Sequence, residues 1–165
     1  MAMGPNEARR RDLIWWALVV PSAAIPAYML IFLLRGSRMQ FGDYFYMLAS
    51  VFSPAGRFTP GGLLVHANEH LSAVPKLLYV LNAELFSGSN ISLGVAVWLM
   101  SAAIFGMLWH HSKPLTATRS APRALLVWVC TAVAFPLQAL HNFVFAMSGA
   151  AWILANVFAL LALTL

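Results

Sequence analysis

Residues 13–34 form an apolar run that fixes the environment in which this chain can fold. The run, LIWWALVVPSAAIPAYMLIFLL, contains no charged side chain. At about 1.5 Å per residue, a helix of this length crosses the roughly 30 Å hydrocarbon core of a bilayer. Pro21 and Pro26 lie inside it, and proline kinks are tolerated in lipid where neighbouring helices satisfy the freed backbone groups. We therefore expect residues 13–34 to be a kinked membrane span.

The composition of the whole chain supports the same environment. Hydrophobic residues make up 61% and charged residues 9% of the 165 residues, against about 45–50% and about 25% in ordinary globular chains. The mean hydropathy is +0.78. So few charges cannot build a water-facing shell, which disfavours a nucleic-acid-binding domain and a disordered chain. The single cysteine, Cys130, cannot form an internal disulfide. The composition therefore predicts an integral membrane protein.

Three further apolar runs follow the first. They cover residues 91–109, 124–147 and 150–165, and the third predicted span is interrupted by Pro136 and Gln138. We predict one all-α transmembrane domain over residues 1–165, built as a bundle of about four membrane helices. Because the last apolar run reaches the final residue, we expect the chain to be the amino-terminal part of a longer polytopic protein.

Basic residues predict the orientation of these spans. Arg9, Arg10 and Arg11 precede the first run, and the connection 110–123 is also basic. Positive residues beside spans stay on the cytoplasmic side, which places the amino terminus and this connection in the cytoplasm. Residues 35–90 then form an outer loop; its own basic residues carry less weight because long loops follow the rule poorly. We expect a multi-pass protein of the inner (plasma) membrane whose partners are membrane lipids and not nucleic acid.

The outer loop is too long to be a simple link between helices. Residues 43–52 and 63–86 have the mixed apolar and polar pattern of helices that lie along a membrane surface. The breaker-rich stretch 53–62 separates them, and SGSN at residues 87–90 is typical of a turn and helix cap. We expect two amphipathic interfacial helices in this loop.

Two acids in the loop are candidate catalytic groups. Asp43 follows Gly42 beside aromatic residues, where a carboxylate could act as a general base or simply cap a helix. Glu69 lies in the motif HANEH with His66 and His70. The pattern HxxEH matches a zinc peptidase motif, but that family needs a distant downstream carboxylate, which this sequence lacks. The motif therefore indicates either binding of a polar or phosphorylated ligand or a solvated helix face.

Other polar residues complete the candidate site. Arg57 and Lys76 could neutralise a phosphate or contact lipid headgroups. Gln138 and Asn142 lie near the outer end of the third run, where polar groups either bridge helices or serve a function. We expect no cofactor and assign no metal ligands, with a divalent metal left open.

The loop and the later spans resemble a known group of proteins. The segments HANEHLSAVPKLLYVLNAELFSGSN and FPLQALHNFVFAMSGAAWILANVFALLAL look like the amino-terminal part of large, uncharacterised bacterial polytopic membrane proteins. Those proteins carry an Asn-Glu-His core, then Pro-Lys or Pro-Arg, and later a Gln-x-x-x-Asn element. Their layout is similar to the GT-C class of glycosyltransferases. This chain departs from the pattern at Leu71, where the group has arginine.

The resemblance implies an activity. It implies transfer of a sugar from a polyprenyl-phosphate-linked donor on the outer face of the membrane, with Asp43 or Glu69 as the base. It also matches Asn68, Glu69 and His70 to the Asn-Glu-His core, in a substrate-binding set of Arg57, His66, Asn68, His70, Lys76, Gln138 and Asn142. The alternative is a non-catalytic small membrane protein, such as a scaffold, a transporter component or an assembly partner.

Overall fold

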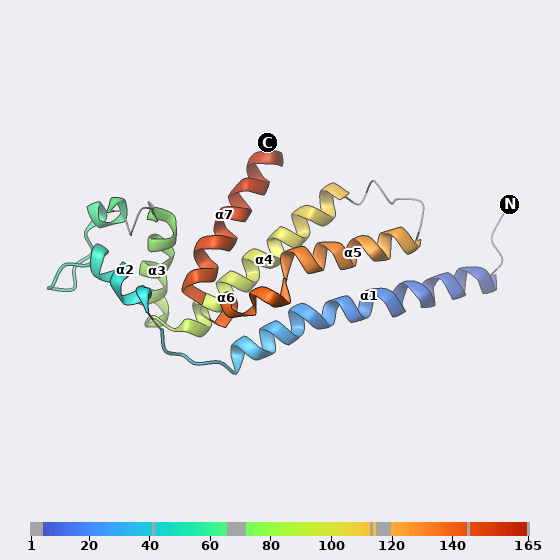
Figure 1. Cartoon of the computed structure of the whole chain (residues 1–165), viewed down its shortest axis with the longest axis horizontal. Helices are drawn as coiled ribbons and strands as arrows, with labels where there is room; N and C mark the ends of the chain where they lie inside the picture. Colours follow the sequence, from blue (N-terminus) through green and yellow to red (C-terminus); the bar gives the residue numbers. More distant parts are fainter. Residues whose placement is uncertain are drawn as a thin grey trace.

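The chain is all-α, as its sequence predicts. The computed structural model describes residues 5–40, 42–65, 72–112, 114, 120–144 and 146–164. Its elements are α1 (Pro5–Leu34), α2 (Asp43–Val51), the 3₁₀-helix η1 (Pro60–Leu64), α3 (Ala73–Phe86), α4 (Asn90–Ser112), α5 (Ser120–Ala134), the 3₁₀-helix η3 (Leu137–Ala139), α6 (Leu140–Val144) and α7 (Ala146–Thr164) (Figure 1). Within the described ranges the β-structure consists of one isolated bridge, between Phe52 and Phe58.

Two of the described helices are long and apolar enough to cross a membrane. They are Asp12–Leu34, which forms most of α1, and Asn90–Ser112, which is α4. The first two predicted spans lie within these helices. The apolar helices Pro122–Ala134 and Ser148–Leu163 are shorter.

The third predicted span, residues 124–147, is not one continuous helix. Helix α5 ends at Ala134, and Pro136 has an extended backbone with φ −70° and ψ 115°. Proline cannot donate a backbone hydrogen bond, and it disfavours the helical conformation of the residue before it. The chain therefore leaves the helix at Phe135 and continues through η3 and α6 before α7 begins at Ala146.

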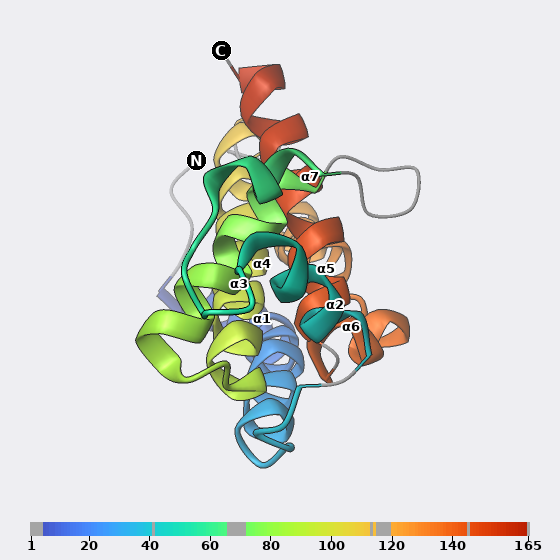
Figure 2. The same ribbon diagram turned by 90° about the vertical axis from the view of Figure 1, so that its left-hand side faces the viewer.

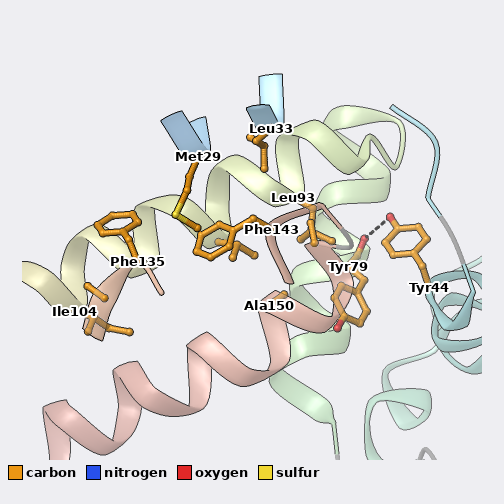
Figure 3. Packing of buried hydrophobic residues seen from close by; sticks show 12 residues of the cluster. Met29, Leu33, Tyr44, Tyr79, Leu93, Ile104, Phe135, Phe143 and Ala150 are labelled. Atoms are coloured by element: carbon orange, nitrogen blue, oxygen red, sulfur yellow. Dashed lines mark hydrogen bonds between the residues drawn. The ribbon is translucent and has the colours of Figure 1, made fainter. Parts of the chain in front are cut away.

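The buried core forms where α4 packs against α1, α6 and α7. Figure 3 shows side chains from these helices meeting around Phe143. A Cβ atom at Gly94 would overlap the side chain of Leu33 and lie 3.2 Å from the carbonyl oxygen of Phe143. The missing side chain at Gly94 therefore lets α1 and α6 approach α4 closely, as small residues do in membrane helix pairs.

Two indole groups tie α1 to its neighbours near its prolines. Trp98 on α4 donates its Nε1 hydrogen to the carbonyl oxygen of Pro26 at 3.0 Å, and Trp128 on α5 donates to that of Leu18 at 2.6 Å. Helix α1 remains helical through Pro21 and Pro26. These side-chain donors link α1 to α4 and α5, the two helices beside it.

The outward faces of the bundle are apolar. Most large hydrophobic side chains of α1 and α7 are exposed, among them Leu13, Ile14, Trp16, Leu18, Val20, Tyr28, Ile31, Phe32, Trp152, Phe158, Leu161 and Leu163. Soluble monomers rarely expose contiguous apolar surfaces of this kind. The surface of α1 and α7 is therefore suited to contact with lipid.

The segment between α1 and α4 folds as a small helical unit at one end of the bundle. This loop unit comprises residues 35–40, 42–65 and 72–89, and Figure 2 shows its helices α2 and α3 toward the viewer. The expected helix at 43–52 is present as α2. The predicted helix at 63–86 corresponds to α3 at its end, but its predicted start is wrong. Residues 63–65 belong to the end of η1 and its C-cap, and α3 begins at Ala73.

Close packing fixes the position of η1. A Cβ atom at Gly62 would overlap the backbone of Ser50, so η1 lies directly on the end of α2, and it ends at the C-cap Val65, whose backbone is extended with φ −69° and ψ 128°. Pro75 lies in the first turn of α3, where a missing N–H costs nothing. At the other end of α3, Ser87 and Gly88 have φ angles of 52° and 67°, which confirms the predicted turn before α4.

Candidate functional site

The loop unit carries the described residues of the predicted site except Gln138 and Asn142. Its position is set by the end of α1 and the start of α4. The backbone N–H of Asn90 donates to the carbonyl oxygen of Arg38 at 2.9 Å, and the Asn90 side chain donates to that of Ser37 at 3.4 Å. The Oδ1 atom of Asn90 accepts a hydrogen bond from the backbone N–H of Ala146 at 3.3 Å. Asn90 therefore joins the start of α4 to the segment that follows α1 and to the start of α7, at the end of the bundle that bears the loop unit.

Asp43 is the first residue of α2. The N-cap position falls on Gly42, with φ 57° and ψ −126°, a conformation that glycine adopts without strain. The capping role considered for Asp43 is therefore filled one position earlier. An acidic residue in the first helical turn is favoured by the helix dipole. The side chain of Asp43 is outside the part of the chain that the structure describes.

A buried hydrogen-bond network holds α2 against α3. Tyr44 is 1% exposed, and its hydroxyl donates to the carbonyl oxygen of Tyr79 at 3.3 Å (Figure 3). The same hydroxyl accepts a hydrogen bond from Asn82 Nδ2 at 3.1 Å. Ser92 Oγ at the start of α4 donates to Asn82 Oδ1 at 2.7 Å. Burial raises the pKa of Tyr44, and the hydrogen bond from Asn82 offsets part of that rise. The phenol is therefore a neutral structural group that fixes the start of α2.

Lys76 lies inside the loop unit and not on its surface. Its side chain is 1% exposed, and its Nζ donates to the carbonyl oxygens of Gly62 at 3.0 Å and Val65 at 2.6 Å. Burial lowers the pKa of Lys76. Two carbonyl dipoles take the place of water around the ammonium group, since a buried charge must be hydrogen-bonded. In this arrangement Lys76 joins η1 to α3 and does not face solvent as a phosphate ligand would.

Arg57 is exposed on a tight turn. The backbone N–H of Ser53 donates to the carbonyl oxygen of Arg57 at 2.9 Å, and the N–H of Arg57 donates to Ser53 Oγ at 3.2 Å. The rings of Phe52 and Phe58, on either side of this turn, have centroids 6.2 Å apart. The turn therefore presents the guanidinium group of Arg57 to its surroundings, where it can meet an anion.

The other predicted residues are only partly described. Gln138 is exposed in η3, and Asn142 lies in α6 with its side chain outside the described set. His66, Asn68, Glu69 and His70 all lie outside the described residues, as does the helix face that their spacing predicts. Within the described ranges, no group of three or more histidine, cysteine or acidic residues is placed to hold a metal ion.

An apolar cavity of about 350 Å³ and a larger one of about 610 Å³ border the loop unit. The larger cavity lies between the first turn of α3 and the middle of α7. Its lining residues are Ser72, Ala73, Val74, Pro75, Ala151, Trp152, Leu154, Ala155 and Phe158. It begins at Ser72, where the described chain resumes after the HANEH segment. A hydrocarbon chain is the chemical class that such a lining accepts.

Comparison with protein-family models, with curated proteins and with solved structures gives no match to this chain. The function must therefore be argued from its own residues.

The sequence reasoning overlooked the residues that hold the loop unit together. Tyr44, Asn82 and Asn90 are all buried and hydrogen-bonded across helices. One signal was available, because an asparagine such as Asn82, between apolar residues of α3, must find partners when it is buried. The identity of those partners depends on the tertiary fold.

Proposed function

We propose that the chain is a membrane-embedded helical bundle of about four spans, with its amino terminus in the cytoplasm and the loop unit on the outer face of the inner membrane. Three observations support this proposal. Two described helices have the length and composition of spans, and the outward faces of α1 and α7 are apolar. Helix α4 also runs from the loop unit at Asn90 to Ser112, so the loop unit and the far end of α4 lie at opposite ends of the bundle (Figure 1).

We further propose that the protein is the amino-terminal part of a glycosyltransferase that uses a polyprenyl-phosphate-linked sugar. The observation that carries the proposal is the fixed start of α2. Asp43 is followed directly by Tyr44, whose buried hydroxyl is bonded to α3. The backbone of the candidate base is therefore held in place at the start of α2, as a general base requires.

In the proposed reaction, Asp43 accepts the proton of an acceptor hydroxyl as that oxygen attacks the anomeric carbon of the donor. The bond from this carbon to the phosphate oxygen breaks, and the polyprenyl phosphate leaves with the bonding electrons. The exposed guanidinium of Arg57 is suited to stabilise the developing phosphate charge. The cavity between α3 and α7 offers an apolar surface for the isoprenoid chain. Glu69 is the second candidate for the base.

The test is sugar transfer by membranes that contain the complete gene product. An Asp43→Asn variant should lower the transfer rate from a radiolabelled polyprenyl-phosphate sugar by about 10²–10⁴-fold, with unchanged protein level. Asp12→Asn is the matched control, because Asp12 is an exposed acid on α1 far from the loop unit. An unchanged rate in Asp43→Asn together with a loss in Glu69→Gln would transfer the base assignment to Glu69. Unchanged rates in both variants would contradict both base assignments, and no transfer by wild-type membranes would contradict the proposed activity.

The buried position of Lys76 favours a second candidate, a non-catalytic scaffold, transporter component or assembly partner. In that case the loop unit is a structural cap, and its lysine serves only to join η1 to α3. This function predicts that alanine at Asp43, Glu69 and His70 leaves the protein fully active in its cell, and complementation of a deletion strain measures it.

A further inference from the structure

A cluster at the opposite end of the bundle from the loop unit has a geometry that the proposed activity does not use. Arg123 lies in the first turn of α5, and its guanidinium carbon is 5.9 Å from the ring centroid of Trp15 and 5.5 Å from that of Trp109. Trp15 belongs to α1 and Trp109 to α4. A cation over an indole face is attracted by the ring quadrupole, so three helices converge on this one cation.

The contact leaves the hydrogen-bond donors of Arg123 available. Stacking on a ring uses the face of the guanidinium plane, whereas its five N–H groups point outward along the edge. Arg123 is exposed, and among the described residues its contacts are these two rings, with neither a carboxylate nor a carbonyl acceptor. A guanidinium fixed in this way is prepared for a bidentate anion such as a phosphate.

The surroundings of Arg123 are positively charged. Arg9 and Arg10 are exposed near the start of α1, and His110 and His111 are exposed at the end of α4. The first turns of α1 carry Arg9, Arg10 and Arg11 against the two acids Glu7 and Asp12. With Arg123, four arginines therefore outnumber two carboxylates at this end, which favours a negatively charged partner.

The tryptophans indicate where that partner is found. Trp15, Trp16 and Trp109 all lie at this end of the two helices that are long enough to span a membrane, and Trp16 is 60% exposed. Indole rings prefer the headgroup level of a bilayer, where one edge is wet and the rest is apolar. The phosphate that reaches Arg123 at this depth is that of a lipid.

We propose that Arg123, held by Trp15 and Trp109, binds the phosphodiester of an anionic phospholipid, in the leaflet opposite the loop unit. We expect the ligand to be a lipid headgroup and not free phosphate, because the rings that hold Arg123 belong to the ends of membrane-length helices. This inference rests on the membrane embedding proposed above and is independent of glycosyl transfer.

The test uses the full chain in phosphatidylcholine vesicles that contain brominated phosphatidylglycerol or brominated phosphatidylcholine. Bromine quenches nearby indole fluorescence, so the ratio of the two quenching curves measures lipid preference. Wild-type protein should prefer phosphatidylglycerol, and Arg123→Gln should lower the preference by about fivefold, the effect of one basic residue at an anionic surface. Arg38→Gln, which removes an exposed arginine of the loop unit that has no role in the proposed reaction, is the matched control and should leave the preference unchanged.

Two further arms keep the test decisive. Arg123→Lys retains the charge without the planar fork, so it should keep only part of the preference, and it serves also if Arg123→Gln does not fold. Millimolar inorganic phosphate should not displace the brominated lipid, whereas full displacement would assign the site to free phosphate and overturn the proposal. Equal quenching by both lipids, or an unchanged preference in both Arg123 variants, would also overturn it. Flotation with the vesicles checks membrane embedding separately, so a failure there contradicts the proposed function instead.

Discussion

The side-chain amide of Asn82 donates a hydrogen bond to the hydroxyl oxygen of Tyr44, with 3.1 Å between the two heavy atoms. The Tyr44 hydroxyl donates in turn to the carbonyl oxygen of Tyr79, and Ser92 donates to the other end of the Asn82 amide. This network connects α2, α3 and α4 through buried groups. A buried polar network is favourable only while each member is satisfied, and the Tyr44 hydroxyl is the member that links α2 to this network.

Removing that hydroxyl should destabilise the protein. Tyr44→Phe leaves the Asn82 Nδ2 group without its acceptor in a buried environment, and the free energy of unfolding should fall by about 1–3 kcal/mol. Thermal unfolding in detergent can be followed by the reaction of Cys130, the single and buried cysteine, with a fluorogenic maleimide. Tyr46→Phe is the control, because Tyr46 is 64% exposed. Equal melting temperatures for the two variants would show that the network contributes nothing.

Two glycines on α4 should respond differently to alanine. Gly94→Ala places a methyl group against Leu33 and the backbone of Phe143, so it should destabilise by about 1–3 kcal/mol, as overpacking does. Gly106 has open space around the same position, and Gly106→Ala should be neutral or stabilise by up to about 1 kcal/mol through helix propensity. The same thiol assay measures both. A stable Gly94→Ala variant would contradict the close approach of α1 to α4.

The sequence predicted most of the helices because hydrophobicity and helix breakers are local properties. The apolar runs at 13–34 and 91–109 correspond to α1 and α4, and the SGSN turn ends α3 as expected. The third run was predicted as one span although it contains Pro136. Pro136 is itself a local signal, and in the structure the helix α5 ends just before it instead of continuing with a kink.

The candidate site was less predictable because burial is a property of the tertiary fold. Arg57 and Lys76 look alike in the sequence, since both are basic residues of the outer loop. The structure exposes Arg57 on a turn and buries Lys76 against two carbonyls of the η1 region. The path of η1 over the end of α2, which Gly62 permits, decides this difference, and no spacing rule indicates it.

The buried ammonium group of Lys76 should make stability depend on pH. Burial lowers its pKa in the folded protein below the ordinary value of 10.5. The unfolded chain therefore binds this proton more tightly, and stability rises with pH between the lowered pKa and 10.5. The Lys76→Met variant lacks this pH-dependent contribution of the Lys76 proton to stability. The difference in unfolding free energy between wild type and Lys76→Met should therefore shift in favour of wild type as pH rises through this window.

The measurement compares chemical unfolding of the two proteins at several pH values up to about 10.5. Tyr44 and Tyr79, whose pKa values burial raises, are present in both proteins and cancel in the difference. Arg57→Met provides a control for the loss of an exposed cation from the loop unit. A difference between wild type and Lys76→Met that stays constant with pH would show that the folded and unfolded states bind the Lys76 proton equally.

The orientation of the bundle can be tested with single cysteines at its two ends. In a Cys130→Ala background, Arg57→Cys places a thiol on the exposed turn of the loop unit, and His111→Cys places one at the exposed end of α4. Because α4 separates these positions by the length of a membrane span, only one should react with a membrane-impermeant maleimide added to intact cells. The basic residues near the start of α1 and after α4 predict that it is the cysteine at position 57. Labelling of position 111 alone would invert the orientation, and labelling of both in sealed cells would contradict the membrane embedding of α4.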